Sequence, residues 1–321
     1  MKIDLRIPVA VLTAAAAVAT SGTTTVATDV SDRTAPTSDR KVVLDPDHDY
    51  GDDYADGVLP VGDGRYRTDR AAKGYVYACA GYAQNLSSGM GGGAQLAGPW
   101  FSPDMTTYDV DEKPAVQGSV EWPADSSVTT RKGTRVIRTN ALPEHATGTF
   151  PVQASDPAYA YDRNPNTIRE QDVTLTLTRR PTYGAARCMS GQVGVMTTGA
   201  ELFSAFDAAG RDAGAWEVQD GCSGHPQMQG VYHYHTLSTC IRKAKVTTVI
   251  GWALDGFPIT GPKVGKGNIL STADLDTCHG LTSTVKINGK KVTTYHYVMT
   301  QDFPYSVSCF RAEPVTTGQA G

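Results

Sequence analysis

The sequence predicts a mainly β protein with little helix. An N-terminal β-rich extension comes first along the chain, followed by two similar C-terminal β units that pack together. Three observations support this class. Glycine and proline are frequent, at 33 and 18 residues, and divide the chain into short segments. Several segments alternate apolar and polar residues with a period of two. A set of short motifs also occurs twice, in the same order, in the C-terminal half.

The N-terminus has the pattern of a secretory signal peptide. Lys2 and Arg6 flank a short apolar run at 7–19, which ends in the small residues Ala-Val-Ala. This pattern predicts a signal peptide over 1–19 and a secreted protein, with the cell envelope as another possible destination. The run is too short to span a bilayer, and no other segment is apolar enough. The alternative is a helix of a cytosolic domain.

The next segments predict a linker and then short strands. Residues 20–60 are rich in Thr, Ser and Asp and predict a disordered, acidic linker before an N-terminal extension over 61–114. Within the extension, 74–82 alternates as a strand does, and the glycine-rich 87–100 predicts a loop. Period-two patterns at 118–122, 134–140 and 172–178 predict strands. The best helical pattern is 200–210, where a strand interpretation competes.

The C-terminal half repeats itself. Residues 194–202 align with 251–259, and both read as an apolar strand, a glycine turn and another apolar strand. A motif with Asp first, Cys third and Gly fifth then occurs at 220–224 and 276–280, and Tyr-His-Tyr occurs at 232–234 and 295–297. We therefore predict one domain over 115–312 that contains repeat units at 193–240 and 250–309.

The repeat also predicts the disulfides. The cysteines number six, and an even count in an exported chain indicates disulfide bonds. If the two units are equivalent, Cys222 pairs with Cys240 and Cys278 with Cys309, which leaves Cys79 for Cys188. The alternative is a pairing across the units, such as Cys240 with Cys278.

The histidines predict a metal site. In a strand, His233 and His235 point to one face with Cα atoms about 6.6 Å apart, within reach of a single metal ion. The second unit adds His296, and we expect His225 or His279 to complete the site. The opposite face is then a packing face; the candidate residues for a second shell are Tyr232, Tyr234, Tyr295 and Asp255.

Imidazole donors without free thiols favour copper, then zinc. The sequence leaves two other interpretations of the histidines open: buried residues that hydrogen-bond to carbonyls and tyrosines, or a metal-free catalytic histidine. It also leaves open whether the protein is an enzyme. A metal-dependent extracellular hydrolase and a structural or glycan-binding cell-surface module are the alternative functions.

The charge balance bears on the partners. The net charge is -4 and no basic stripe is present, so nucleic acid is a poor candidate partner. The predicted partner is a metal ion, while the sequence does not specify a protein or glycan partner.

The segments that carry the repeat resemble the YHYH protein family, which is named for the tetrapeptide at 232–235. The resemblance covers residues 116–311 and includes "DGCSGHPQMQGVYHYHTLSTC", "GWALDGFPITGP" and "YHYVMTQDFPYSVSCF", with "LPEHATGTFP" upstream. Where the family usually has an Asn-Gly turn, this chain has Thr198-Gly199. The resemblance implies an exported protein and no particular activity.

Overall fold

A computed structural model of the protein describes residues 41–51, 57–89, 95–265 and 267–317. The predicted signal peptide lies outside these residues. Within them the protein is mainly β, as predicted, and its principal element is a sheet of eight strands. None of the described helices is long and apolar enough to cross a membrane.

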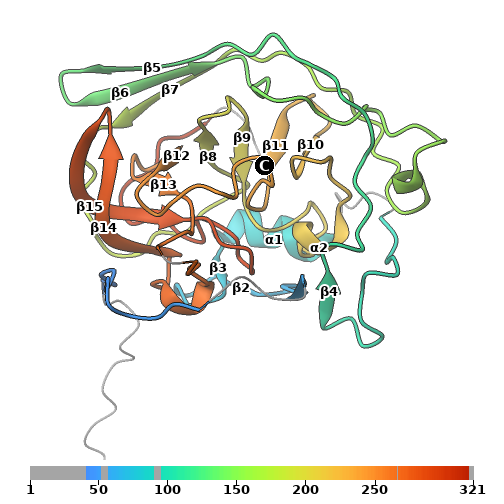
Figure 1. Ribbon diagram of the computed structural model, residues 1–321, viewed down its shortest axis with the longest axis horizontal. Coiled ribbons are helices and arrows are strands. Elements are labelled where there is room, and N and C mark those ends of the chain that lie inside the picture. Colours follow the sequence, from blue (N-terminus) through green and yellow to red (C-terminus); the bar gives the residue numbers. More distant parts are fainter. Residues whose placement is uncertain (1–40, 52–56, 90–94, 266, 318–321) are drawn as a thin grey trace, which may run out of the picture. The chain divides into compact units, whose positions relative to one another are not determined.

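The large sheet has the strand order β10-β11-β9-β8-β12-β13-β15-β14. Figure 1 shows β8, β9, β12 and β13 in its middle, with β10 and β11 on one side and β14 and β15 on the other. The strands of its first half are β8 (Gln192–Met196), β9 (Glu201–Phe203), β10 (Gly224–Pro226) and β11 (Tyr232–Tyr234). Those of its second half are β12 (Val249–Ala253), β13 (Pro258–Thr260), β14 (Gly280–Ile287) and β15 (Lys290–Val298).

The two halves of the sheet have the same strand order and the same pairing. β8 and β12 meet at the centre as antiparallel neighbours. On each side follow an antiparallel pair (β8–β9, β12–β13), a parallel pair (β9–β11, β13–β15) and an outer antiparallel pair (β11–β10, β15–β14). This arrangement is consistent with two similar units, and the repeat bounds at 193–240 and 250–309 stay a prediction.

Both halves begin with a tight turn that requires glycine. Gly199 and Gly256 have φ values of 92° and 90°, a region that other residues rarely adopt. The amide of Gly199 donates to Met196 O, and that of Gly256 to Ala253 O. The turn at Thr198-Gly199 therefore forms without the asparagine that the family usually has there.

The remaining elements form small sheets and short helices. A three-stranded sheet contains β5 (Ser126–Arg131), β6 (Thr134–Thr139) and β7 (Val173–Thr178). Two-stranded pairs join β1 (Val58–Pro60) to β4 (Thr107–Asp109) and β2 (Tyr66–Arg67) to β3 (Val76–Tyr77). The helices are α1 (Ala80–Ser88), α2 (Ala213–Trp216) and the 3-10 turns η1 (Pro157–Ala160) and η2 (Thr272–Asp274).

Three local predictions differ from the structure. The helical pattern at 200–210 contains β9 instead, because neighbouring strands on both sides supply backbone partners to this segment. The strand-like 74–82 contains only the short β3, and α1 begins at Ala80, with Ala83 and Leu86 buried. Segment 118–122 makes only an isolated bridge, between Val120 and Thr147.

Residues 41–51 and 57–60 belong to the segment predicted as a linker, and the structure gives them regular contacts. Leu44 N donates to Thr282 O at 3.0 Å, and Thr282 N donates to Val42 O at 2.7 Å. Val58–Pro60 forms β1, in which Leu59 is buried. The chain from 41 onward therefore supplies backbone partners to the edge strand β14.

All three predicted disulfides are present. Cys79 pairs with Cys188, Cys222 with Cys240 and Cys278 with Cys309. The first joins the N-terminal extension to the start of the repeated region, and the other two each close a loop within one half of the large sheet. The pairing across the units is therefore excluded.

Candidate metal centre

Three of the candidate histidines lie together at the outer end of the first half of the sheet. His225 in β10 and His233 in β11 are direct partners in the antiparallel ladder, so their side chains share one face. His235 follows β11 and lies two residues beyond His233, which returns its side chain to the same face. A carboxylate joins them from outside the sheet: Glu217 directly follows α2.

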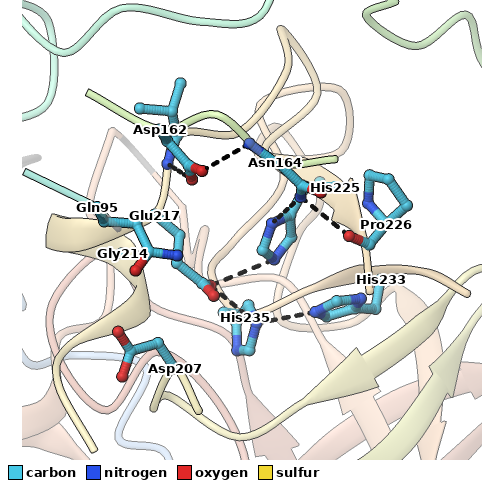
Figure 2. A network of polar contacts seen from close by, with 12 residues as sticks. Gln95, Asp162, Asn164, Asp207, Gly214, Glu217, His225, Pro226, His233 and His235 are labelled. Carbon is cyan, nitrogen blue, oxygen red and sulfur yellow. Dashed lines mark hydrogen bonds and ion pairs between the residues drawn. The ribbon is translucent and has the colours of Figure 1, made fainter. Parts of the chain in front are cut away.

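The donor atoms of these side chains converge. His233 Nε2 lies 2.9 Å from His235 Nε2. Glu217 Oε2 lies 3.2 Å from His225 Nε2 and 3.2 Å from His235 Nε2. Figure 2 shows the imidazoles turned toward one another, with the carboxylate of Glu217 between His225 and His235. Donors about 2.0–2.1 Å from a tetrahedral zinc ion lie roughly 3.3 Å from one another, so these separations match a shared metal ion.

The other ring nitrogens fix the tautomers of two histidines. His233 Nδ1 lies 3.1 Å from Val231 O, and His235 Nδ1 is within hydrogen-bond distance of Ser204 O. A carbonyl oxygen only accepts, so both Nδ1 atoms carry the hydrogen. In the neutral rings both Nε2 atoms then present lone pairs to each other, and a cation between them relieves that repulsion.

The carboxylate and His225 also lack ordinary hydrogen bonds. Glu217 Oε2 and His225 Nε2 are buried without a hydrogen-bond partner, although they lie 3.2 Å apart. The distance is short but the alignment is not that of a hydrogen bond. Unsatisfied buried polar atoms are rare in native proteins and call for an explanation such as an ion. On its other side, His225 Nδ1 has a long contact of 3.5 Å with Asn164 Nδ2.

Burial sets the protonation states of the group. It lowers the pKa of His233 well below the usual range, and the neighbouring His225 and His235 lower it further. Burial also lowers the pKa of His235, although Glu217 opposes the shift. These two rings are therefore neutral at pH 7, as metal ligands must be.

His225 and Glu217 shift each other's pKa. Burial lowers the pKa of His225, but the carboxylates of Glu217 and Asp162 outweigh it, and the net shift is upward. Burial raises the pKa of Glu217, but the imidazoles of His225 and His235 outweigh it, and the net shift is downward. Glu217 is therefore ionised, and its negative charge favours a cation at this point.

The tyrosines that alternate with these histidines lie on the packing face. Both are buried. Tyr232 OH donates to the carboxylate of Asp220, and Tyr234 OH lies 2.6 Å from His145 Nε2 and 3.1 Å from Thr198 Oγ1. The alternation therefore separates one histidine face from one packing face, as the sequence predicts.

The structure does not bring His296 and His279 to this group. His296 lies in β15, on the same face as His233 but five strand positions away, which corresponds to roughly 24 Å. Its ring is satisfied by hydroxyl groups, with Nδ1 2.9 Å from Thr260 Oγ1 and Nε2 2.8 Å from Ser283 Oγ. His279 lies in a turn, where its Nε2 is 3.0 Å from Thr300 Oγ1.

The residues proposed as a second shell make their hydrogen bonds elsewhere. Tyr295 OH donates to Asp276 Oδ1 at 3.0 Å, and Asp255 Oδ2 accepts from Tyr297 OH at 2.6 Å. Both contacts lie in the second half of the sheet, away from the three histidines. Asn164 and the carbonyls of Val231 and Ser204 instead orient the histidine rings.

A second set of metal-ligand atoms is occupied by a covalent bond. A nitrogen of His145 and the sulfurs of Cys222 and Cys240 lie within 4.8 Å of one another. Because the two cysteines form a disulfide, their sulfurs are not available as thiolate ligands. The disulfide instead closes the loop that carries His225, His233 and His235.

Glu217 is the site residue that sequence reasoning missed. It follows a four-residue helix and matches no ligand spacing with the histidines, which lie further along the chain. The helix starts at the cap residue Asp212, whose side chain accepts from Gly214 N, and this local motif fixes where Glu217 leaves the helix. Only the folded arrangement shows that the carboxylate reaches the imidazoles.

The comparisons with known proteins identify one family. No curated protein and no solved structure matches the chain significantly. The model of the family described as YHYH protein matches residues 172–268, which span β7 to β13 and include all three clustered histidines. The part of the chain that forms the candidate metal centre is therefore similar to the YHYH protein family.

Proposed function

We propose that this protein binds a transition metal ion, copper or zinc, through His225, His233 and His235, with Glu217 as the fourth ligand. Three imidazoles and one carboxylate form a donor set that suits Cu(II) and Zn(II). The observation that carries the proposal is the distance of 2.9 Å between the Nε2 atoms of His233 and His235. In both rings the other nitrogen, Nδ1, faces a carbonyl oxygen, so neither Nε2 carries a hydrogen in the neutral ring.

The contrast with the other buried histidines supports metal binding over a structural role. Both ring nitrogens of His296 face hydroxyl groups, which can donate or accept as needed. His225 Nε2 and Glu217 Oε2 lack such a partner. A structural explanation therefore accounts for His296 and leaves the first cluster unexplained.

The donor set also favours binding over hydrolysis as the first hypothesis. Four donors from the described chain complete a tetrahedral site, whereas a metal-dependent hydrolase keeps a coordination position open for water. The three histidines are 3–4% exposed, so little solvent reaches them. We further propose an exported location, which the three disulfides support.

The test is a calorimetric titration of metal-free protein with Zn(II) and, separately, Cu(II) at pH 7. We expect one ion per chain and release near pH 5, because protons compete for the imidazoles as the pH falls, and first for His225, whose pKa is raised. His233→Ala removes a ligand, and we expect affinity to fall by roughly 100-fold or more, beyond the 10–100-fold typical of outer-shell partners.

The matched control is His296→Ala, which removes an equally buried histidine from the corresponding strand of the other half. It should bind metal as the wild type does. Tyr234→Ala is the control for lost stability: it should cost about 3–5 kcal/mol and keep the stoichiometry. Absence of uptake by the wild type, or equal affinity of His233→Ala, would contradict the proposal.

A further inference from the structure

A pocket of about 470 Å³ lies beside the segments that carry the metal ligands. Its lining includes Gly214, Ser223 and Thr236, which lie within one to three residues of Glu217, His225 and His235 respectively. Its volume falls in the range of small-molecule sites. Neither the fold nor the proposed metal site explains why this pocket is present.

Lys113 provides the first indication of a ligand. Its ammonium donates to Gly214 O at 2.5 Å, and within the described chain no carboxylate lies within ion-pair distance of it. An ammonium has three donors, so two remain for a ligand in the pocket. Burial lowers the pKa of Lys113 to about 8, while Asp212, Glu217 and Asp162 oppose the shift from further away.

Arg242 adds a second cation to the same lining, and the described residues supply it with no ion-pair partner either. Asp220 also lines the pocket, but its oxygens accept from the amides of Cys222 and Gly224 and from Tyr232 OH, which offset its charge. Asp111 is exposed at the rim. The hydroxyls of Ser223, Thr236 and Thr239 provide further hydrogen-bonding groups.

We propose that this pocket binds a small molecule through a carboxylate or phosphate group, with Lys113 and Arg242 as the residues that pair with the anion. The half-buried ammonium of Lys113 provides a point charge and the guanidinium of Arg242 a planar fork, and both suit oxygen anions. The serine and threonine hydroxyls then contact the remainder of the ligand.

The anion also couples to the metal centre, a part of the inference that rests on the proposed function. Lys113 Nζ donates to the carbonyl oxygen of Gly214 in α2, the short helix that Glu217 directly follows, so its positive charge lies near the proposed metal centre and disfavours a cation there. An anion on Lys113 offsets this effect and so favours a cation on the histidines. Coupling of this kind is reciprocal, so a bound metal raises the affinity for the anion by the same factor.

The first experiment uses the whole, metal-free protein in the presence of a chelator. We titrate it with inorganic phosphate and, separately, acetate, and follow thermal unfolding. In parallel, an added acetylating reagent modifies exposed lysines, and peptide mass spectrometry measures the extent of modification at Lys113. We expect saturable stabilisation at millimolar concentrations together with protection of Lys113. The anion that acts at the lower concentration identifies the chemistry, and chloride at equal ionic strength should do neither.

Arg242→Met should weaken anion binding about tenfold, the effect of losing roughly 1.4 kcal/mol of pairing. Lys243→Met is the matched control, since it removes the same charge from the next residue, which does not line the pocket. Lys113→Met should abolish the stabilisation by the anion. If neither anion stabilises the protein, or Arg242→Met and Lys243→Met bind equally, the inference is wrong.

A second titration repeats the anion series with the metal bound. Tighter anion binding than in metal-free protein supports the coupling, and equal binding contradicts it. If the protein takes up no metal, the proposed function fails while the result in metal-free protein still decides the anion site.

Discussion

The two halves of the large sheet share a scaffold and differ at the positions that make the candidate metal centre. In each half an aspartate holds the turn before the outer hairpin: Asp220 accepts from Cys222 N and Gly224 N, and Asp276 from Cys278 N and Gly280 N. Each carboxylate also accepts from a buried tyrosine in the second strand of that hairpin. Because these contacts occur twice, they belong to the fold and not to the site.

The difference lies on the opposite face. The residue after the repeated glycine is His225 in the first half and Leu281 in the second, and the residue after Tyr-His-Tyr is His235 or Val298. Leu281 and Val298 are fully buried in an apolar cluster with Leu270. The second half therefore flanks its histidine, His296, with hydrocarbon, while the first half flanks His233 with imidazoles, so two positions distinguish the candidate metal centre from its counterpart.

The largest expected effect comes from the shared turn, because only the second half pairs its aspartate with a buried arginine. The carboxylate of Asp276 also pairs with Arg311 at 2.8 Å, and both side chains are fully buried. Asp276→Ala removes a partner from a buried charge and should cost about 3–5 kcal/mol. Asp220→Ala leaves only neutral donors without their acceptor and should cost about 1–3 kcal/mol.

Denaturant unfolding of the two variants measures this difference. Equal losses would show that the pair with Arg311 adds little and that the two turns are energetically alike. A larger loss for Asp220→Ala would contradict the assignment of the buried charge to the second half.

Sequence reasoning recovered the features that local residue types and the repeat determine. The strand pattern of β6 and β7, the glycine turns and the disulfide pairs all follow from local residue types and from the equivalence of the two units. The alternation of tyrosine and histidine correctly separated the two faces of β11, because strand geometry alone fixes it.

What the sequence could not supply is the distance between equivalent positions. The repeat suggested that His296 joins His233, but equivalent strands lie at opposite ends of an eight-stranded sheet. Glu217 reaches the site through a short helix whose direction depends on tertiary contacts. No sequence spacing between Glu217 and the histidines therefore predicts it as a ligand. Sequence period fixes which face a residue occupies, while strand order decides its neighbours.

An intermediate effect concerns the histidines of the second half. Burial lowers the pKa of His296 and that of His279 to about 3. The unfolded chain, with a histidine pKa of about 6.5, then binds protons that the folded protein excludes. Their contribution to stability is complete above pH 6.5 and is lost as the pH falls toward 3, by up to about 1.4 kcal/mol per pH unit for each histidine.

His296→Gln keeps hydrogen-bonding atoms near Thr260 and Ser283 but cannot titrate. In metal-free protein we expect its unfolding free energy to fall less steeply between pH 6.5 and 4 than that of the wild type. The difference in slope should correspond to about one proton fewer taken up on unfolding. Parallel pH profiles for the two proteins would mean that His296 is not excluded from protonation in the fold.

The smallest expected change in stability accompanies the most direct test of the metal centre. The triple variant His225→Leu/His235→Val/Glu217→Leu places the residues of the second half at two equivalent positions of the first and removes the carboxylate that would otherwise lose both imidazoles. Without metal, we expect its unfolding free energy to lie within about 1–2 kcal/mol of the wild type or above it, because apolar residues replace the whole group of buried polar ones.

The measurement is the unfolding free energy of both proteins with and without Zn(II) or Cu(II) at pH 7. At 100 times the dissociation constant the metal should stabilise the wild type by about 2.7 kcal/mol and leave the folded triple variant unchanged. Equal stabilisation of both proteins, or of neither, would contradict a metal centre at His225, His233, His235 and Glu217.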